Sequence, residues 1–316
     1  MISPKILVIH QGAIGDFILS LPAVQTIKYA FPEGRFEMLG YPAILSLAGS
    51  NFADTISSVD RAPASTLYGD FADISAQMRQ YLGGFERIFI FSAQEHSAFI
   101  ENIKRCHPAA VHIRTFPATA QHVVDYQLAQ LAAMGCAPAE PVPRLYLSCD
   151  DKSRAGAFLR ENTFNSEAPL LAVHPGSGGR QKCWPPQFFV SAMHKLHKER
   201  HAGFLIVQGP ADEKTAGNVQ AGLARLPHAL LANLDLPLVA ALLSRCSLFI
   251  GNDSGITHIA AALGIPTVAV FGPTDPAVWA PRGESVCIVR EGDGSGQWRW
   301  PGAGAVLQNA LRLLGG

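Results

Sequence analysis

A glycine-containing polar turn in the last third of the chain has the residue types of an anion-binding site. The turn, residues 251–255 (GNDSG), follows a predicted buried strand and precedes an alanine-rich segment that is predicted to be helical. Asp253, Ser254 and Gly255 lie in the turn, and His258 lies in the first turn of the helix. A helix that begins where a parallel strand ends offers backbone N–H groups and the positive end of its dipole to an anion. We therefore predict a phosphate site, with a nucleotide as the expected ligand.

A second polar loop, residues 174–189 (HPGSGGRQKCWPPQFF), also stands between a predicted strand and a predicted helix. Its glycines let a ligand approach the backbone closely, and Ser177 lies among them. Lys182 follows on the same loop and supplies a point charge that suits a phosphate. The residues alone leave open the alternative of a flexible glycine loop with a solvated lysine.

Two carboxylates occupy comparable positions at predicted helix starts. Asp16 lies in the segment 10–23 (HQGAIGDFILSLPA), after the first predicted strand, and Glu213 lies in the segment 208–219 (QGPADEKTAGNV). At the carboxyl edge of an open α/β sheet, where ligands bind, Asp16 has the position of a general base and Glu213 that of an acceptor for ribose hydroxyls. Both also suit a helix start for structural reasons, Asp16 as an N-cap and Glu213 as a first-turn charge that matches the helix dipole.

The composition argues against several classes of protein. The chain has 316 residues with a formal net charge of zero, whereas a nucleic-acid binder usually has a basic surplus. The six scattered cysteines lack the spacing of a zinc site, which indicates reduced thiols and a cytoplasmic compartment. No Asp-x-Asp metal-binding signature is present, and no apolar stretch is long enough to predict a membrane-spanning helix. The N-terminus lacks the layout of a signal peptide.

Strand-like and helix-like patterns alternate twice along the chain, which is typical of doubly wound parallel sheets. The predicted strands are residues 5–10, 35–39, 87–91 and 111–114 in the first half, and 170–174, 204–208, 230–232, 247–250, 267–271 and 286–289 in the second. A proline- and alanine-rich stretch and a polar helix separate the halves near residue 165. We therefore predict an α/β protein with one domain over 1–165, a second over 166–302, and a C-terminal helix over 303–316 that can pack back on the first domain.

In their order and spacing, these motifs resemble glycosyltransferase family 9, the ADP-heptose:lipopolysaccharide heptosyltransferase family. The shared patterns are a G-x-x-G-D turn ending at Asp16, H-P-G-S-G…K-x-W-P from His174, a G-x-x-x-E segment ending at Glu213, and G-N-D-S-G-x-x-H followed by G-P-T-D-P. The resemblance spans nearly the whole chain, and the last pair of motifs is its most specific part.

The resemblance implies a GT-B fold, in which two Rossmann-like, doubly wound domains face a central cleft and the second holds most of a nucleotide-sugar donor. It implies an inverting, metal-independent transfer to a lipopolysaccharide core or another surface glycan, with heptose from ADP-heptose as the best-known case. No cofactor beyond the donor is expected. The catalytic residues carried over are Asp16, as general base, and Lys182, near the donor phosphates. The donor-binding residues carried over are Ser177, Lys182, Glu213, Asp253, Ser254, Gly255 and His258.

The expected partners are the nucleotide sugar and a glycolipid or oligosaccharide acceptor, without nucleic acid. The expected location is the cytoplasm, and a peripheral contact with the inner face of the bacterial inner membrane stays open. Family members often have lysine or arginine where this chain has His10, and the first half of the chain has more acidic than basic residues, so the acceptor is the least defined partner. The alternatives are a GT-B-like sugar-nucleotide epimerase, a non-catalytic nucleotide-binding protein, and an NAD-dependent oxidoreductase, which the incomplete glycine fingerprint disfavours.

Overall fold

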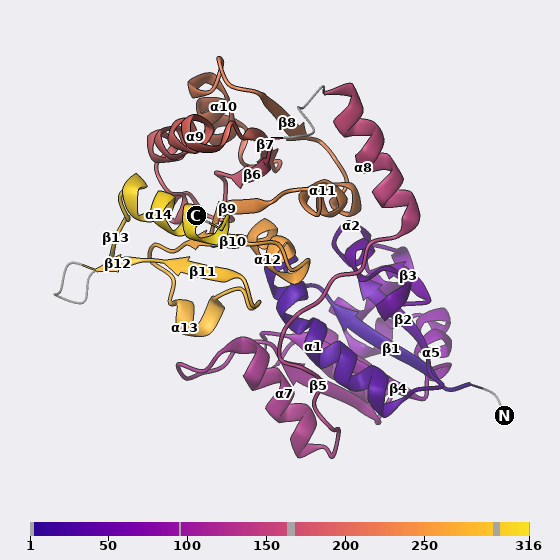
Figure 1. The fold of residues 1–316 in the computed structure, drawn as a ribbon. Coiled ribbons are helices and arrows are strands. Elements are labelled where there is room, and N and C mark those ends of the chain that lie inside the picture. The colour runs from indigo at the N-terminus through magenta and orange to yellow at the C-terminus, as the bar shows by residue number, and fades with distance from the viewer. Residues whose placement is uncertain (1–2, 95, 163–167, 293–297, 316) are drawn as a thin grey trace. The chain divides into compact units, whose positions relative to one another are not determined.

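The computed structural model describes residues 3–94, 96–162, 168–292 and 298–315. The chain forms two α/β units, Met1–Pro141 and Val142–Gly316, and each unit has its own parallel sheet whose strands are connected by helices (Figure 1). The prediction of two doubly wound domains is therefore confirmed.

The first unit is built on a five-stranded parallel sheet with the strand order β3-β2-β1-β4-β5. Its strands are β1 (Lys5–His10), β2 (Arg35–Gly40), β3 (Thr55–Ser58), β4 (Arg87–Ser92) and β5 (Ala110–Arg114). Its helices are α1 (Ile14–Ala30), α2 (Pro42–Leu45), α3 (Gly49–Phe52), α4 (Ala62–Ser65), α5 (Ala76–Gly83), α6 (Ala98–Cys106) and α7 (Val123–Ala133), with 3-10 turns at Ser46–Ala48, Thr66–Tyr68 and Phe71–Asp73. The strand order reverses between β1 and β4, and open α/β sheets bind their ligands at such a point.

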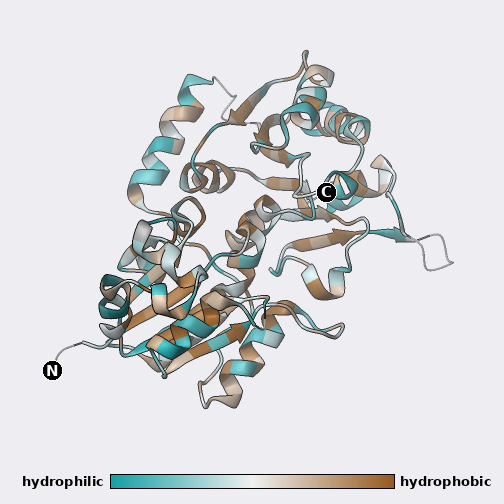
Figure 2. Ribbon diagram, turned by 180° about the vertical axis from the view of Figure 1, so that it is seen from behind, coloured by the Kyte–Doolittle hydropathy of each residue, from teal (hydrophilic) through white to brown (hydrophobic). Residues whose placement is uncertain are grey.

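The core of the first unit explains why its strands read as continuous apolar runs. Every residue of β1 after the first is buried, as expected for a strand covered on both faces. Leu7 and Ile9 lie opposite Ile88 and Ile90 of β4, and all four belong to one apolar cluster. In Figure 2 the strands of this sheet are accordingly largely brown, the colour of hydrophobic residues.

The second unit is built on a six-stranded parallel sheet with the order β11-β10-β9-β6-β7-β8. Its strands are β6 (Leu170–His174), β7 (Gly203–Gln208), β8 (His228–Ala232), β9 (Leu248–Asn252), β10 (Thr267–Val270) and β11 (Val286–Val289), and an antiparallel pair is formed by β12 (Glu291–Gly292) and β13 (Trp298–Arg299). Its helices are α8 (Cys149–Glu161), α9 (Pro186–Arg200), α10 (Glu213–Gly222), α11 (Leu236–Leu243), α12 (Gly255–Ala262), α13 (Pro276–Trp279) and α14 (Ala303–Leu313), with a 3-10 turn at Arg180–Lys182. Here the strand order reverses between β6 and β9.

The division between the units differs from the predicted domains. The predicted boundary near residue 165 lies outside the described residues, and the two units divide between Pro141 and Val142. Helix α8 belongs to the second unit, where it packs against α11, and Arg154 of α8 forms an ion pair with Asp235 before α11. The polar sequence of α8 concealed this attachment.

The C-terminal helix packs on the sheet of the second unit. Val306 and Ala310 are fully buried in the core of the second unit, and α14 packs on α9 and on the sheet. The two residues are one helical turn apart and form an apolar stripe that covers the sheet of the unit to which the helix belongs. Helix α14 is therefore part of the core of the second unit.

Trp184 ties the loop after β6 to the segment that leads into α14. Its indole is fully buried, packs edge-on against Phe189, and donates from Nε1 to the carbonyl oxygen of Pro301 at 2.8 Å. The glycine loop that precedes Trp184 is thereby anchored in the core of the second unit.

We expect Trp184→Phe to lower the free energy of unfolding of the second unit by about 1–3 kcal/mol, because it leaves the buried carbonyl of Pro301 without its donor. Urea unfolding followed by circular dichroism measures the change. Trp298→Phe is the matched control, because Trp298 is only half-buried on the short strand β13. Equal losses for the two variants would contradict the anchoring role.

Candidate functional site

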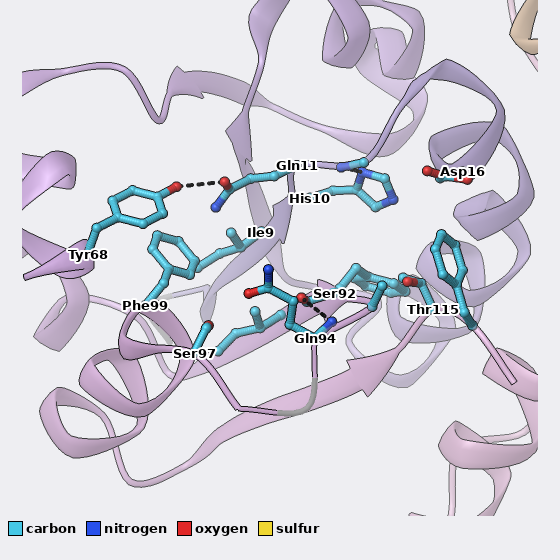
Figure 3. Close-up of a pocket in the computed structure, with 15 residues that line it drawn as sticks. Ile9, His10, Gln11, Asp16, Tyr68, Ser92, Gln94, Ser97, Phe99 and Thr115 are labelled. Atoms are coloured by element: carbon cyan, nitrogen blue, oxygen red, sulfur yellow. Dashed lines mark hydrogen bonds between the residues drawn. The ribbon is translucent and has the colours of Figure 1, made fainter. Parts of the chain in front are cut away.

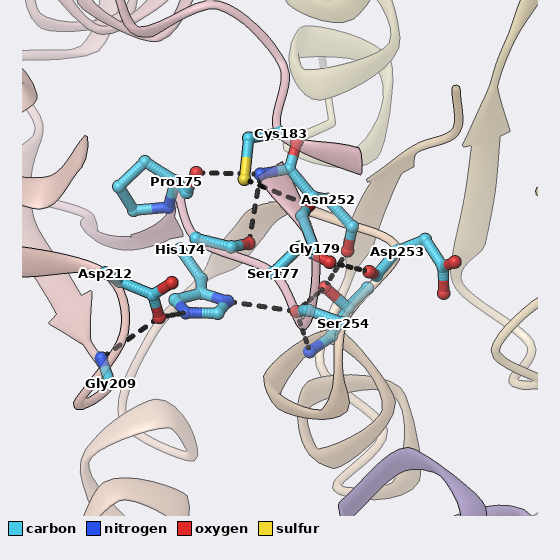
Figure 4. A network of polar contacts seen from close by, with 12 residues as sticks. His174, Pro175, Ser177, Gly179, Cys183, Gly209, Asp212, Asn252, Asp253 and Ser254 are labelled. Carbon is cyan, nitrogen blue, oxygen red and sulfur yellow. Dashed lines mark hydrogen bonds and ion pairs between the residues drawn. The ribbon is translucent and has the colours of Figure 1, made fainter. Parts of the chain in front are cut away.

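The second unit has a polar network where its strand order reverses, between β6 and β9 (Figure 4). The two strands are neighbours, with His174 opposite Gly251. The glycine loop follows His174, and the turn that leads into α12 follows Asn252. The two loops that were predicted as separate anion-binding motifs therefore meet at one edge of the sheet.

Asn252 joins these two loops from the inside. Its side chain is fully buried, and Nδ2 donates to the carbonyl oxygens of Pro175 and Gly176 at 2.9 and 3.1 Å. Its Oδ1 accepts the N–H of Trp184 at 2.9 Å. Leaving such a buried group unpaired costs about 1–3 kcal/mol, so the amide holds both loops in a fixed relation.

Ser177, Lys182 and Asp253 form the more exposed part of the network. Ser177 Oγ donates to the carbonyl oxygen of Asp253 at 2.6 Å, and Lys182 Nζ donates to Asp253 Oδ2 at 2.8 Å. The same carboxylate oxygen accepts the hydroxyl of Thr274 at 2.7 Å. The Lys182 side chain is 32% exposed. Because an ammonium group has three N–H donors, Lys182 can bind an anion while Asp253 holds it near the start of α12.

A buried line of hydrogen bonds runs from Asp212 through His174 to Ser254 (Figure 4). His174 Nε2 lies 2.9 Å from Asp212 Oδ2, and His174 Nδ1 lies 2.9 Å from Ser254 Oγ. Ser254 is the N-cap of α12, and its Oγ accepts the N–H of Thr257 at 3.4 Å. Burial by itself raises the pKa of Asp212, but the hydrogen bonds from His174 and from the N–H of Gly209 outweigh burial and hold that pKa below its ordinary value. The ionised carboxylate thus fixes the imidazole, which orients Ser254.

Position 176 requires a glycine, because the loop backbone there passes close to the side chain of Asp212. A Cβ on Gly176 would lie 1.9 Å from Cγ of Asp212, so any side chain would displace the carboxylate. The glycine of the motif therefore serves a close approach of backbone to side chain.

The structure brings together four of the residues that were predicted to bind a phosphorylated ligand. They are Ser177, Lys182, Asp253 and Ser254. Gly255 is the first residue of α12, and His258 is buried within the same helix. These six residues therefore lie on two adjoining loops and the helix that follows them.

The predicted carboxylate of the third motif is not part of the network. Glu213 is exposed as the first residue of α10, and the preceding residue, Asp212, supplies the buried carboxylate. Three further residues of the network, His174, Asn252 and Thr274, were not predicted from the sequence. Each of these lies inside a motif that had been singled out, but its partner is distant in sequence.

The first unit has a polar site where β1 leads into α1 (Figure 3). Asp16 is the third residue of α1, and its Oδ2 accepts the N–H of the N-cap residue, Ala13, at 3.2 Å. The N-cap interpretation of Asp16 was therefore wrong in position, although the carboxylate does satisfy a backbone N–H at the helix start. Asp16 also lines a cavity of about 360 Å³ that lies between the ends of β1 and β4. Among the described residues, no group of three or more His, Cys, Asp or Glu is arranged to hold a metal ion.

His10 supports the turn that carries Asp16. It is buried, its Nδ1 accepts the N–H of Gly12 at 3.2 Å, and its Nε2 lies 3.3 Å from Ser20 Oγ, which donates to the carbonyl oxygen of Asp16 at 2.8 Å. This pattern assigns the ring proton to Nε2. Burial lowers the pKa of His10 to about 4, against a smaller opposing effect of a hydrogen bond with the backbone of Asp16. The imidazole is therefore neutral at physiological pH.

We expect His10 to make the protein less stable as the pH falls from 6.5 towards 4. His10 of the unfolded chain takes up a proton near pH 6.5, whereas folded His10 takes it up only near pH 4. The free energy of unfolding therefore falls by about 3 kcal/mol as the pH drops across this window. The variant His10→Gln lacks this contribution, and its free energy of unfolding should vary less between pH 6.5 and 4.

Urea unfolding at a series of pH values measures this difference. His96→Gln is the control, because the His96 side chain is 87% exposed and its loss should leave the pH dependence unchanged. Parallel curves for the wild type and His10→Gln would show that His10 does not titrate as described.

Comparison with known proteins places this architecture in a family. Residues 104–297, more than half of the chain, match the profile of glycosyltransferase family 9 (heptosyltransferase). The lipopolysaccharide heptosyltransferase 2 of Salmonella typhimurium is 30% identical over 154 residues, which are 47% of this chain and 43% of that protein. The matched segment thus spans less than half the length of this curated relative.

Two solved structures resemble the chain over almost its full length. A family 9 glycosyl transferase from Veillonella parvula superposes with a TM-score of 0.82 at 18% identity, covering 99% of this chain and 98% of its own. The ADP-heptose lipopolysaccharide heptosyltransferase II of Escherichia coli gives a TM-score of 0.76 at 20% identity and covers 98% of both chains. The likeness shows that the fold is GT-B, with two Rossmann-like domains. The profile match and this fold together show that the chain belongs to glycosyltransferase family 9.

Proposed function

We propose that the protein is an inverting glycosyltransferase that takes a sugar from a nucleotide-diphosphate donor without an obligatory metal ion. The observation that carries this proposal is the network of the second unit, where Lys182, Ser254 and the N-terminus of α12 converge at one sheet edge. A cationic side chain, a hydroxyl group and the N–H groups of a helix start suit a diphosphate that gains negative charge as the sugar leaves.

The proposed donor is ADP-heptose, and the proposed acceptor is a lipopolysaccharide core or another surface glycan. The Escherichia coli structure is named for ADP-heptose, and the Salmonella relative is a lipopolysaccharide heptosyltransferase. The acceptor is accordingly a glycolipid or an oligosaccharide, and no cofactor beyond the donor takes part.

Asp16 is the proposed general base. The acceptor oxygen forms a bond to the anomeric carbon, and the bond from that carbon to the diphosphate breaks, with its electron pair leaving on the diphosphate. Asp16 takes the hydroxyl proton during this displacement. Its position beside a cavity at the switch point of the first sheet supports this role.

The proposed location is the cytoplasm, with a peripheral contact at the inner face of the inner membrane where the acceptor is a glycolipid. Within the described part of the chain, no helix is both long and apolar enough to cross a bilayer.

We expect Asp16→Asn to reduce transfer from ADP-heptose by at least about 100-fold, because the amide cannot take the acceptor proton. Binding of ADP, measured by calorimetry, should stay within about twofold of the wild type, because binding at the diphosphate site does not use this base. Asp70→Asn, at an exposed position of the same unit, is the control. Full turnover of Asp16→Asn would show that Asp16 is not the base. Formation of an epimerised nucleotide sugar in a reaction without acceptor would show that the protein is an epimerase rather than a transferase.

A second experiment separates the phosphate contacts from the ribose contacts. Lys182→Ala should weaken the binding of both ADP and inorganic pyrophosphate by about tenfold or more, because a hydrogen bond to a charged group is lost. If Glu213 binds the ribose, Glu213→Gln should weaken the binding of ADP and leave the binding of pyrophosphate unchanged. Glu199→Gln, at an exposed position of α9, is the matched control for charge. Unchanged affinity of Lys182→Ala for both ligands would contradict the proposed diphosphate site, and unchanged ADP affinity of Glu213→Gln would remove the ribose contact.

A further inference from the structure

The cavity of the first unit has a lining that indicates the chemistry of its ligand. It lies at the carboxyl ends of β1 and β4, with Asp16 at one end and Tyr68 at the other (Figure 3). With about 360 Å³, it has the size of a small-molecule site. A ligand that places a hydroxyl at Asp16 therefore extends its other groups towards Tyr68.

Two carboxamides provide neutral hydrogen-bonding groups in this cavity. Gln11 Oε1 accepts the hydroxyl of Tyr68 at 2.6 Å, which turns its Nε2 group away from that ring. Gln94 lines the opposite wall after β4, and its backbone N–H donates to Ser92 Oγ at 3.1 Å. A carboxamide both donates and accepts hydrogen bonds, as a sugar hydroxyl does, so the pair is suited to ring hydroxyl groups.

An aromatic surface adjoins these amides. The rings of Tyr68 and Phe99 pack with centroids 4.8 Å apart and an interplanar angle of 31°, and both line the cavity. Tyr68 is 51% exposed, and Phe116, which also lines the cavity, is 39% exposed. Exposed rings with a polar neighbour match a ligand that has both an apolar face and hydroxyl groups.

The charges at the cavity disfavour an anionic ligand. Among the described residues that line it, Asp16 is ionisable as an acid, His10 is neutral at physiological pH, and none is lysine or arginine. A phosphate or carboxylate group bound beside Asp16 would be repelled by it. This lining contrasts with the second unit, where Lys182 stands at the proposed diphosphate site.

We propose that this cavity binds an uncharged saccharide unit, with one hydroxyl at Asp16, the ring on Tyr68, and further hydroxyls at Gln11 and Gln94. The proposal rests on the proposed function, because it makes this saccharide the acceptor of the transfer. The acceptor is then a neutral sugar of a glycan rather than a phosphorylated or acidic one.

Nuclear magnetic resonance of the full chain without donor tests the proposal. The probes are methyl mannoside and mannose 6-phosphate, and the signals are the side-chain amide groups of Gln11 and Gln94, assigned through their loss in Gln11→Ala and Gln94→Ala. We expect methyl mannoside to shift these signals at lower concentration than mannose 6-phosphate does. Gln94→Ala should weaken mannoside binding by roughly fivefold, as expected when a neutral hydrogen bond is lost. In this variant, binding is measured from the side-chain amide signal of Gln11.

A charge variant provides a second measurement. Gln11→Lys should shift the preference towards mannose 6-phosphate by about tenfold, since it adds a cation at the wall that faces the ligand. Gln80→Lys adds the same charge at an exposed position of α5 and should change nothing. Tighter binding of mannose 6-phosphate to the wild type, or no shift of either amide signal with the mannoside, would overturn the proposal. Because these readings need no donor, they are independent of whether ADP-heptose is consumed.

Discussion

The buried amide of Asn252 is the contact on which the site of the second unit depends. Parallel strands bring the ends of β6 and β9 to one edge, but strand pairing does not determine where the loops beyond that edge go. Asn252 fixes the course of these loops, because its three hydrogen bonds hold the backbone at Pro175, Gly176 and Trp184. These backbone groups lie beyond the sheet ladder and need another partner when buried. Ser177 and Lys182 are therefore placed by an interaction that neither of them makes.

In the first unit, too, a buried side chain fixes the loop that follows a strand. There the loop after β1 is held by neutral His10, whose Nδ1 accepts the N–H of Gly12. In both units a glycine allows the close approach: a Cβ on Gly12 would lie 2.8 Å from the His10 ring, and one on Gly176 would collide with Asp212. The glycines after β1 and β6 thus make room for side chains that orient a carboxylate or a hydroxyl, in addition to any room they leave for a ligand.

Features that depend on neighbouring residues could be predicted from the sequence, and contacts between residues distant in the sequence could not. The strand–turn–helix motifs and the two Rossmann-like folds could be predicted, because long apolar runs and turn residues are local signals. Strand β3 was missed because TISS is a short edge strand with partly exposed polar residues. Asp212 was not predicted as part of the network, because it lies at the same helix start as Glu213, and only its contact with His174, 38 residues away, distinguishes the two. Arg154 likewise joins α8 to Asp235, 81 positions away, so no local signal in the sequence assigns α8 to the second unit.

Asp253 places a carboxylate where a diphosphate is proposed to bind, and its contacts explain how the two are compatible. Its Oδ2 accepts hydrogen bonds from Lys182 and Thr274, so much of its negative charge is compensated within the protein. The pair of Lys182 and Asp253 has no net charge, so the intact donor gains little from long-range attraction to it. The remaining N–H donors of Lys182 and those at the start of α12 act at short range, and their interaction strengthens as the diphosphate acquires charge. Under the proposed function, this arrangement stabilises the departing group more than the bound donor, and only such a difference accelerates transfer.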